Sequence, residues 1–248
     1  MKLLVDWGNS ALKWAQTEGD RLGEPGRCEW RPATDLDALL DHHWRSLPQP
    51  SAVVASLVGP PETAEALGRW TGRRWGLTPR LIGAQRKSLG VTCGYHQPER
   101  LGADRWAALV AAHQLAPAGA LVVDLGTATT LDALSGGRHL GGYILPGPEA
   151  LQGALLDTTA IELDQAADDP GPWGRSTAGC IRQGAVQALV ALVESSLERL
   201  QAAGVCDPTL IVTGGQAGFL MPHIQVDYLH RPHLVLEGVM LLAREATS

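Results

Sequence analysis

The chain has 248 residues, a formal net charge of −6 and a hydrophobic content of 45%. This length suits two domains of roughly 120 residues each, and the apolar side chains suffice for a sizeable buried core. The acidic balance argues against a nucleic-acid partner, which requires a basic face. It does not exclude anionic small molecules, because local cations and backbone amides can hold them.

Cysteine usage and the apolar pattern indicate the compartment. The four cysteines lie far apart and form no C-x-x-C pair, so we expect reduced thiols rather than a zinc site or a redox dithiol. The first residues lack the charged and apolar regions of a signal peptide, and no apolar run approaches the ~18 residues of a membrane helix. We therefore expect a soluble, cytoplasmic protein with no membrane partner.

The first half of the chain contains short apolar strands and amphipathic or Ala-rich helices. Strands are predicted over residues 2–7 and 52–56, and residues 11–16 suit a hairpin partner of the first strand. Thr34 is expected to cap the first helix. Helices are predicted over residues 35–44, 61–70 and 103–115.

The same kinds of element start again in the second half. Strands are predicted over residues 120–125, 129–134, 139–145 and 209–212. Helices are predicted over 184–200 and 234–243, and a Pro- and Gly-rich loop over 168–174. Strand meanders followed by alternating helices and strands indicate an α/β architecture that occurs twice. We place the boundary near Pro117, which gives domains over 1–116 and 117–248.

A repeated phrase marks the first strand of each half. Residues 3–14 read LLVDWGNSALKW and residues 121–132 read LVVDLGTATTLD. In both, an aliphatic strand ends in Asp, a large apolar residue, Gly and a small polar residue. Such a turn offers amides and hydroxyls to a phosphate, and its Asp suits a cation or a cation-bound water. Two such turns facing one another would clamp the phosphates of a nucleotide; the alternative for each turn alone is an ordinary β-hairpin.

Two further clusters suit a nucleotide-dependent enzyme. Residues 102–105, Gly-Ala-Asp-Arg, place a carboxylate and a guanidinium at the positive end of a helix, although an Asp there also simply favours the helix dipole. Residues 213–215, Thr-Gly-Gly, follow an apolar strand and can lie against an adenine or ribose, as well as forming an ordinary strand-to-helix turn. No P-loop and no Rossmann glycine motif occurs. The eight tryptophans are scattered and are expected in the core or at the domain interface.

Six segments in chain order resemble the type III pantothenate kinases, a family of the acetate and sugar kinase, Hsp70 and actin superfamily. Each segment alone is a weak signal, and the set spans nearly the whole chain. The segments are D-W-G-N-S-A-L-K at 6–13, Y-H-Q-P-E-R-L-G-A-D-R at 95–105, D-L-G-T-A at 124–128, G-G-Y-I-L-P-G at 141–147, G-R-S-T at 174–177 and T-G-G at 213–215.

This resemblance implies two duplicated ribonuclease-H-like domains with ATP in the cleft between them. Residues 6–13 would form the first phosphate loop and residues 124–128 the second, with residues 213–215 beside adenosine. Asp6 would orient Mg²⁺ through water, and Asp124 would bind the monovalent cation, potassium or ammonium, that the family requires. The implied ATP-binding residues are Asp6, Trp7, Gly8, Asn9, Ser10, Ala11, Leu12, Lys13, Thr127, Thr213, Gly214 and Gly215.

The implied reaction transfers the ATP γ-phosphate to the primary hydroxyl of pantothenate, the first step of coenzyme A synthesis. Asp104 aligns with the family's catalytic base, which accepts the hydroxyl proton as the oxygen attacks phosphorus in line. Arg105 suits the carboxylate of pantothenate. The implied pantothenate contacts are Tyr95, Gly102, Ala103, Asp104, Arg105 and Thr177. The resemblance also implies a homodimer with the pantothenate site close to the subunit interface.

Two departures from the family pattern bear on this interpretation. Gln216 follows T-G-G where many members have Asp, and Ser10 replaces the commoner Thr. The alternatives are a related kinase of another small hydroxylated substrate, and a non-catalytic nucleotide-binding regulator of the Bvg accessory factor type. The segment 95–105 argues against the first alternative, and the intact Asp104 argues against the second. An Hsp70- or actin-like ATPase would usually need a longer chain.

Overall fold

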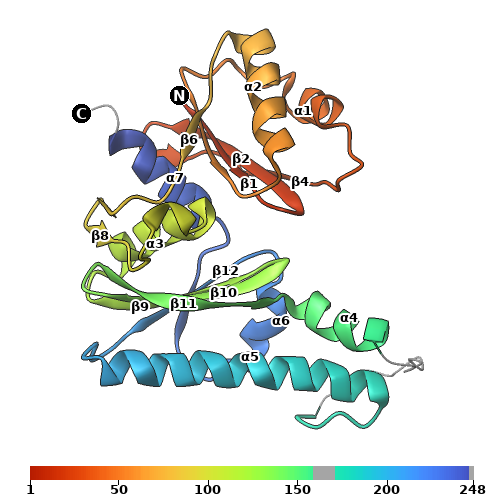
Figure 1. The fold of residues 1–248 in the computed structure, drawn as a ribbon, viewed down its shortest axis with the longest axis vertical. Coiled ribbons are helices and arrows are strands. Elements are labelled where there is room, and N and C mark those ends of the chain that lie inside the picture. The colour runs from red at the N-terminus through yellow and green to blue at the C-terminus, as the bar shows by residue number, and fades with distance from the viewer. Residues whose placement is uncertain (159–170, 246–248) are drawn as a thin grey trace. The chain divides into compact units, whose positions relative to one another are not determined.

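The computed structural model describes residues 1–158 and 171–245, which form two compact units (Figure 1). Unit 1 contains residues 1–115 and the segment from His233 onward, and unit 2 contains residues 116–232. The first limit lies beside the predicted boundary near Pro117. The second differs from the prediction, because the C-terminal helix α7 (Leu234–Glu245) belongs with unit 1 rather than with the second domain.

Unit 1 is built on a sheet with the strand order β3-β2-β1-β5-β6, in which β4 also pairs with β2. β1 and β2 form an antiparallel hairpin, and β5 and β6 are added in parallel. A small antiparallel hairpin of β7 and β8 follows. The strands are β1 (Leu3–Trp7), β2 (Ala11–Glu18), β3 (Arg21–Leu22), β4 (Gly26–Glu29), β5 (Val53–Leu57), β6 (Arg80–Ile82), β7 (Lys87–Ser88) and β8 (Val91–Thr92). The helices are α1 (Leu36–Trp44), α2 (Pro61–Trp75), α3 (Ala103–Leu115) and α7, with a short 3₁₀ turn η1 (Pro98–Arg100) before α3.

The side chains of β1 divide between the two faces of this sheet. Leu3, Val5 and Trp7 belong to the core cluster that includes buried residues of α1 and α2. Because successive side chains of a strand alternate, Leu4 and Asp6 lie on the other face. α7 contacts β1 and β5, and α3 contacts β5. Tryptophan dominates the core cluster, as expected, through Trp7, Trp14, Trp30, Trp44, Trp70 and Trp75.

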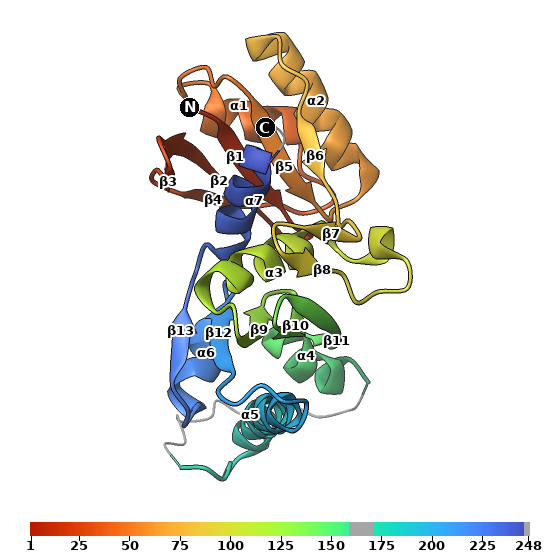
Figure 2. The same ribbon diagram turned by 90° about the vertical axis from the view of Figure 1, so that its left-hand side faces the viewer.

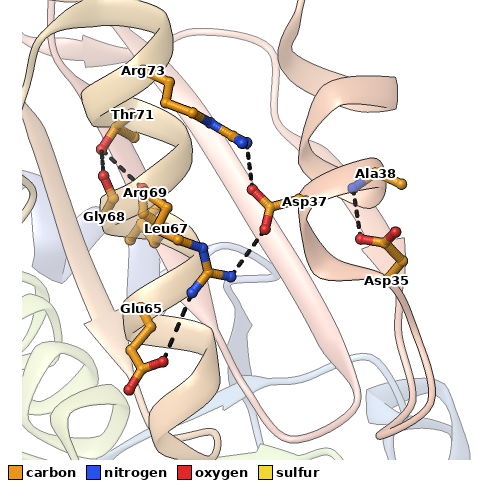
Figure 3. A network of polar contacts seen from close by, with 9 residues as sticks. All are labelled: Asp35, Asp37, Ala38, Glu65, Leu67, Gly68, Arg69, Thr71 and Arg73. Carbon is orange, nitrogen blue, oxygen red and sulfur yellow. Dashed lines mark hydrogen bonds and ion pairs between the residues drawn. The ribbon is translucent and has the colours of Figure 1, made fainter.

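The outer surface of α1 and α2 is joined by ion pairs (Figure 3). The carboxylate of Asp37 accepts from Arg69 at 2.9 Å and from Arg73 at 2.5 Å. These pairs are exposed and each contributes at most about 1 kcal/mol. The N-cap of α1 is Asp35, whose Oδ1 accepts from Ala38 N at 3.1 Å, so the prediction of Thr34 as the cap is wrong by one residue.

Unit 2 is built on strands in the order β13-β12-β9-β10-β11. The strands are β9 (Gly119–Leu125), β10 (Ala128–Ser135), β11 (Arg138–Pro146), β12 (Thr209–Thr213) and β13 (Tyr228–His230). The helices are α4 (Pro148–Thr158), α5 (Thr177–Ala202) and α6 (Ala217–Leu220), followed by the 3₁₀ turn η2 (Met221–His223). Leu121, Val123 and Leu125 of β9 pack in one core cluster with the apolar stripe of α5, which Figure 2 shows end-on. The predicted loop 168–174 lies outside the described residues up to residue 170, and residues 171–174 contain no helix or strand.

The two units repeat one topology. In each, an antiparallel hairpin is followed by two parallel strands: β1, β2, β5 and β6 in unit 1 correspond to β9, β10, β12 and β13 in unit 2. The next α-helix after the last parallel strand is α3 in the first set, which comes after β7, β8 and η1, and α7 in the second set, which follows β13 directly. The predicted duplicated α/β architecture is confirmed. In the described part of the chain, no helix combines the length and the hydropathy that crossing a membrane requires.

Gly238 permits the close packing of α7 on α3, and its substitution tests this contact. A Cβ at Gly238 would lie 1.9 Å from the carbonyl oxygen of Ala107, a distance that the two backbones must relieve by moving apart. We expect Gly238→Ala to lower the free energy of unfolding by about 1–3 kcal/mol, measured by urea denaturation.

Gly72 in α2 is the matched control. A Cβ there meets nothing within 4 Å, so Gly72→Ala should stabilise the chain by up to about 1 kcal/mol through the helix propensity of Ala. Equal stability of the two variants would contradict the packing of α7 on α3.

Candidate functional site

The first Asp-x-Gly turn closes the β1–β2 hairpin of unit 1. Gly8 N donates to Ala11 O at 3.0 Å, and Trp30 Nε1 donates to Gly8 O at 3.0 Å, so the turn is fixed from both sides. Asp6 pairs with Lys13 in the strand register. Asp6 is only 6% exposed, and its Oδ2 lies 3.7 Å from Lys13 Nζ. The turn therefore holds a buried carboxylate beside an ammonium group.

The other predicted residues of this turn divide between core and solvent. The side chains of Trp7 and Leu12 are fully buried in the core cluster, so toward a ligand they can offer main-chain atoms only. Asn9 and Ser10 are exposed at the tip of the hairpin, between Gly8 and Ala11. Main-chain amides and a hydroxyl are thus presented at one end of the sheet, as a phosphate requires.

Ser56 is a site candidate that the sequence motifs do not indicate. Parallel pairing of β5 with β1 places Ser56 beside Asp6, and its side chain is fully buried. Its hydroxyl has no hydrogen-bond partner within the described residues. Buried hydroxyls are nearly always satisfied, so a ligand or water bound at this turn is the natural partner. The sequence signal is only one polar residue within the aliphatic run VVASLV.

The start of α3 lies at the same end of the unit 1 sheet. Val58 directly follows β5 and donates its N–H to Trp7 O at 3.1 Å. A Cβ added to Gly102 would lie 3.8 Å from Val58 Cγ1 and 2.5 Å from Asp104 Oδ1, so a side chain there would displace the Asp104 carboxylate. Asp104 Oδ1 accepts from the backbone N–H of Arg105 at 2.7 Å. Unit 1 therefore brings the first turn and the Asp104 carboxylate to one end of its sheet.

Arg105 is held by Tyr95. Its side chain is buried, with 7% exposure of the residue, and its Nη1 donates to Tyr95 Oη at 2.8 Å. The guanidinium carbon lies 5.6 Å from the centre of the Tyr95 ring, within the range of a cation–π interaction. A buried guanidinium requires such partners. Ala103, on the same first turn of α3, is also buried.

The second Asp-x-Gly turn closes the β9–β10 hairpin of unit 2. Gly126 N donates to Ala128 O at 3.0 Å, the counterpart of the bond across the first turn. In the register, Asp124 lies beside Thr130 of β10 and Thr213 of β12. A carboxylate flanked by two threonines is a set of oxygen donors, which suits a hard cation.

Glycines allow the neighbouring segments to approach this second turn. Gly214 has φ +98°, and a Cβ there would lie 2.5 Å from Asp124 Oδ1 and 2.3 Å from Leu125 O. Gly147 N donates to Thr127 O at 3.0 Å, and its own Cβ would collide with the turn backbone. The T-G-G segment and the end of the G-G-Y-I-L-P-G segment thus both pack on the turn that carries Asp124, and Gly215 continues the first of them.

The residues predicted to contact pantothenate fall on both units. Tyr95 and residues 102–105 belong to unit 1, whereas Thr177 belongs to unit 2. Thr177 is the first residue of α5, whose N-cap Ser176 accepts from Gly179 N at 3.0 Å. Within unit 1 the structure brings Asp6, Asp104 and Arg105 to one region, and within unit 2 it brings Asp124 and the T-G-G segment together.

The other titratable groups of the described residues include a buried pair in unit 2, in which His139 Nε2 lies 2.9 Å from Asp132 Oδ1. No group of three or more His, Cys, Asp or Glu side chains that could hold a metal ion occurs in the described part of the chain. Burial raises the pKa of the Cys28 thiol to about 11, against the opposing effect of Arg27, so this thiol is neutral at neutral pH. Burial and the neighbouring His42 lower the pKa of His43, whose ring centre lies 5.3 Å from that of Trp14.

The fold is that of the actin-like ATPases and sugar kinases. MreB 5 of Spiroplasma citri, solved with bound AMPPNP, superposes with a TM-score of 0.52 at 12% identity, covering 99% of this chain and 96% of that one. A Campylobacter jejuni protein described provisionally as a Baf family transcriptional activator superposes with a TM-score of 0.65 at 20% identity, covering 99% and 98%. At these identities the likeness shows the fold alone.

Sequence comparison identifies the family. The type III pantothenate kinase family model matches residues 2–199. The type III pantothenate kinase of Nitrosococcus oceani is 34% identical, covering 100% of this chain and 96% of the relative. The chain belongs to the type III pantothenate kinase family, and the resemblance of the six segments is confirmed.

The unsatisfied hydroxyl of Ser56 leads to a stability prediction. Ser56→Ala removes a buried polar group that has no partner, so we expect the free energy of unfolding without ligand to stay unchanged or to rise by about 1 kcal/mol. Urea denaturation of the ligand-free protein measures it.

Ser196→Ala is the control for this substitution. Ser196 is also buried, but its Oγ donates to Leu192 O at 2.6 Å, so the same change there should lower the unfolding free energy by about 1 kcal/mol for the lost bond, less about 0.5 kcal/mol for the helix propensity of Ala in α5. A loss of stability in Ser56→Ala as large as in Ser196→Ala would mean that the Ser56 hydroxyl has a protein partner.

Proposed function

We propose that this chain is an ATP-dependent pantothenate kinase, which transfers the ATP γ-phosphate to the primary hydroxyl of pantothenate and yields 4'-phosphopantothenate for coenzyme A synthesis. The observation that carries this proposal is the similarity to type III pantothenate kinases along the whole chain. The structure supports it through three carboxylates, Asp6, Asp104 and Asp124, each held at a strand end or a helix start.

Asp104 is proposed as the general base. Its Oδ1 accepts from the N–H of Arg105, and it lies in the first turn of α3, where the helix dipole stabilises a negative charge. Both effects favour the ionised carboxylate, which is the form that can accept the proton of the attacking hydroxyl, and the hydrogen bond also orients it. A positioned base contributes typically 10²–10⁴-fold in rate. Positioning and charge neutralisation should contribute more than the base, because the transition state of phosphoryl transfer is loose.

The first turn is proposed to bind the ATP phosphates. The proposed donors are the amides of residues 9–11, the Ser10 hydroxyl and the Lys13 ammonium, together with the second turn at Thr127. Residues 213–215 would lie by the adenosine. Mg²⁺ typically binds one or two carboxylates, several waters and the phosphates of its nucleotide. The buried Asp6 carboxylate, with no cluster of three acidic groups in the described residues, fits that ligand set, and the ion would neutralise phosphate charge there.

Asp124 is proposed to bind the monovalent cation, potassium or ammonium. The flanking threonines and the glycine at position 214 give its carboxylate oxygen-rich, closely packed surroundings, which is the chemistry of a hard cation site. As the family implies, we also propose that the protein is a homodimer in the cytoplasm and that pantothenate binds near the subunit interface.

The alternative function is a nucleotide-binding regulator without turnover. The likeness in fold to the Campylobacter jejuni protein is its support, and at 20% identity this likeness does not extend to function. The presence of Asp104, Arg105 and Tyr95 favours the enzyme. A regulator needs neither a general base nor an arginine held in place for the pantothenate carboxylate.

A coupled assay of ADP release tests the proposed reaction. Release should require pantothenate, Mg²⁺ and a monovalent cation together, and Asp104→Asn should lower kcat by about 10²–10⁴-fold with an unchanged unfolding transition. Gln114→Ala, a change at an exposed position near the other end of the same helix, is the control for disturbance of α3 and should retain the activity. ATP hydrolysis that proceeds without pantothenate would contradict the proposal, and nucleotide binding without turnover would favour the regulator.

The cation site is tested separately through Asp124. Asp124→Asn keeps the size of the side chain and removes its charge, so the half-saturating K⁺ concentration should rise by at least about 10-fold, while the KM for pantothenate changes little. A titration of activity with KCl at constant ionic strength measures this. An unchanged K⁺ dependence would move the proposed cation site away from Asp124.

A further inference from the structure

We propose that Arg86 is a positioning residue for the acceptor side of the reaction, which holds Tyr95 in place so that Tyr95 in turn holds Arg105. This inference rests on the proposed pantothenate kinase function and deepens it. None of the six segments that identify the family contains Arg86, which lies in the loop just before β7.

Arg86 contacts the loop of residues 93–97 through both the side chain and the main chain of the arginine. Its Nη1 donates to Tyr95 O at 3.0 Å and its Nη2 donates to His96 O at 2.9 Å, so one guanidinium joins two successive carbonyls. Its own carbonyl accepts from Cys93 N at 3.0 Å. The side chain therefore fixes residues 95 and 96 relative to the β7–β8 hairpin.

The loop needs an external contact of this kind. Residues 93–97 contain neither helix nor strand, and they connect β8 to the 3₁₀ turn η1 ahead of α3. No strand ladder or helix fixes the backbone of Tyr95 within this loop. The two hydrogen bonds from Arg86 act on the main chain at the position that determines where the Tyr95 ring lies.

The position of the Tyr95 ring matters because of Arg105. Tyr95 Oη accepts from Arg105 Nη1 at 2.8 Å, and a hydrogen bond is lost within a shift of about 1 Å. The ring face also lies against the guanidinium. A shift of the Tyr95 backbone would release a buried guanidinium that is proposed to bind the pantothenate carboxylate. Misplacement of about 1 Å in a binding group can lower efficiency by 10²-fold.

The type of side chain at position 86 is also specific. A guanidinium presents donors in a rigid fork that can meet two carbonyls at once, whereas an ammonium is a single point of charge on a flexible chain. Arg86 is exposed and lies outside the core clusters, so its replacement should leave the fold stable. Lysine should keep the charge but only part of the function.

Steady-state kinetics with pantothenate and ATP test the inference. We expect Arg86→Ala to raise the KM for pantothenate by about 10-fold and Arg86→Lys by a few-fold, with the KM for ATP, kcat and the melting temperature little changed. Arg100→Ala is the matched control, because Arg100 is an exposed arginine in the same connection whose side chain forms no hydrogen bond or ion pair within the described residues. It should leave the KM for pantothenate unchanged.

A double-mutant cycle with Tyr95→Phe separates positioning from a general loss of order. If Arg86 acts through the Tyr95 hydroxyl, Arg86→Ala should raise the KM much less in the Tyr95→Phe background than in the wild type, because the bond it supports is already gone. Fully additive effects, an unchanged KM in Arg86→Ala, or a fall in kcat alone would each overturn the inference. A wild-type chain that phosphorylates no pantothenate would overturn the proposed function, and the inference with it.

Discussion

The alternation of side chains at the end of the first strand in each unit is the constraint on which the candidate site depends. Trp7 and Leu125 are fully buried in the two core clusters, and each follows an aspartate directly. Because neighbours on a strand point to opposite faces, anchoring the apolar residue in the core turns Asp6 and Asp124 toward the opposite face. The glycine that follows then closes the hairpin with a main-chain hydrogen bond. The sequence Asp, large apolar residue, Gly therefore presents one carboxylate and one turn of amides at the end of a strand, and it occurs twice in the chain.

Glycines allow neighbouring segments to approach the carboxylates closely. Gly214 contacts the turn that carries Asp124, Gly102 contacts the Asp104 carboxylate, and in each place a Cβ would lie 2.5 Å from the carboxylate oxygen. A side chain at either glycine would therefore displace the carboxylate. The proposed binding of two anionic substrates to a chain of net charge −6 would depend on local donors, which are Lys13 at the first turn, Arg105 at α3, and the amides of two turns.

Much of this arrangement could be predicted from the sequence, because it depends on local patterns. The aliphatic strands, the Ala-rich helix and the repeated turn all produce short-range signals, and the predicted ranges overlap β1, β5, α3, β9 and β12. Elements whose existence depends on tertiary pairing could not be predicted. β6 and β13 are three-residue strands that form only because a buried parallel neighbour is available. α5 begins seven residues before its predicted start, since Ser176 caps it ahead of the apolar stripe. Ser56 and Arg86 carry no motif, and only the register and the hydrogen bonds show their neighbours.

The assignment of α7 to unit 1 shows how far a functional residue can depend on distant sequence. α3 carries Asp104 and Arg105 on its first turn, and α7 packs on α3 through Gly238, more than a hundred residues away in the chain. The family model matches residues 2–199 and so does not include α7, although the helix supports an element proposed to carry the catalytic base. If each repeat packed only on its own elements, α3 would be supported by the first repeat alone. Here the last helix of the second repeat supports α3 instead, so the integrity of the acceptor side depends on the C-terminal helix as much as on the motif that identifies it.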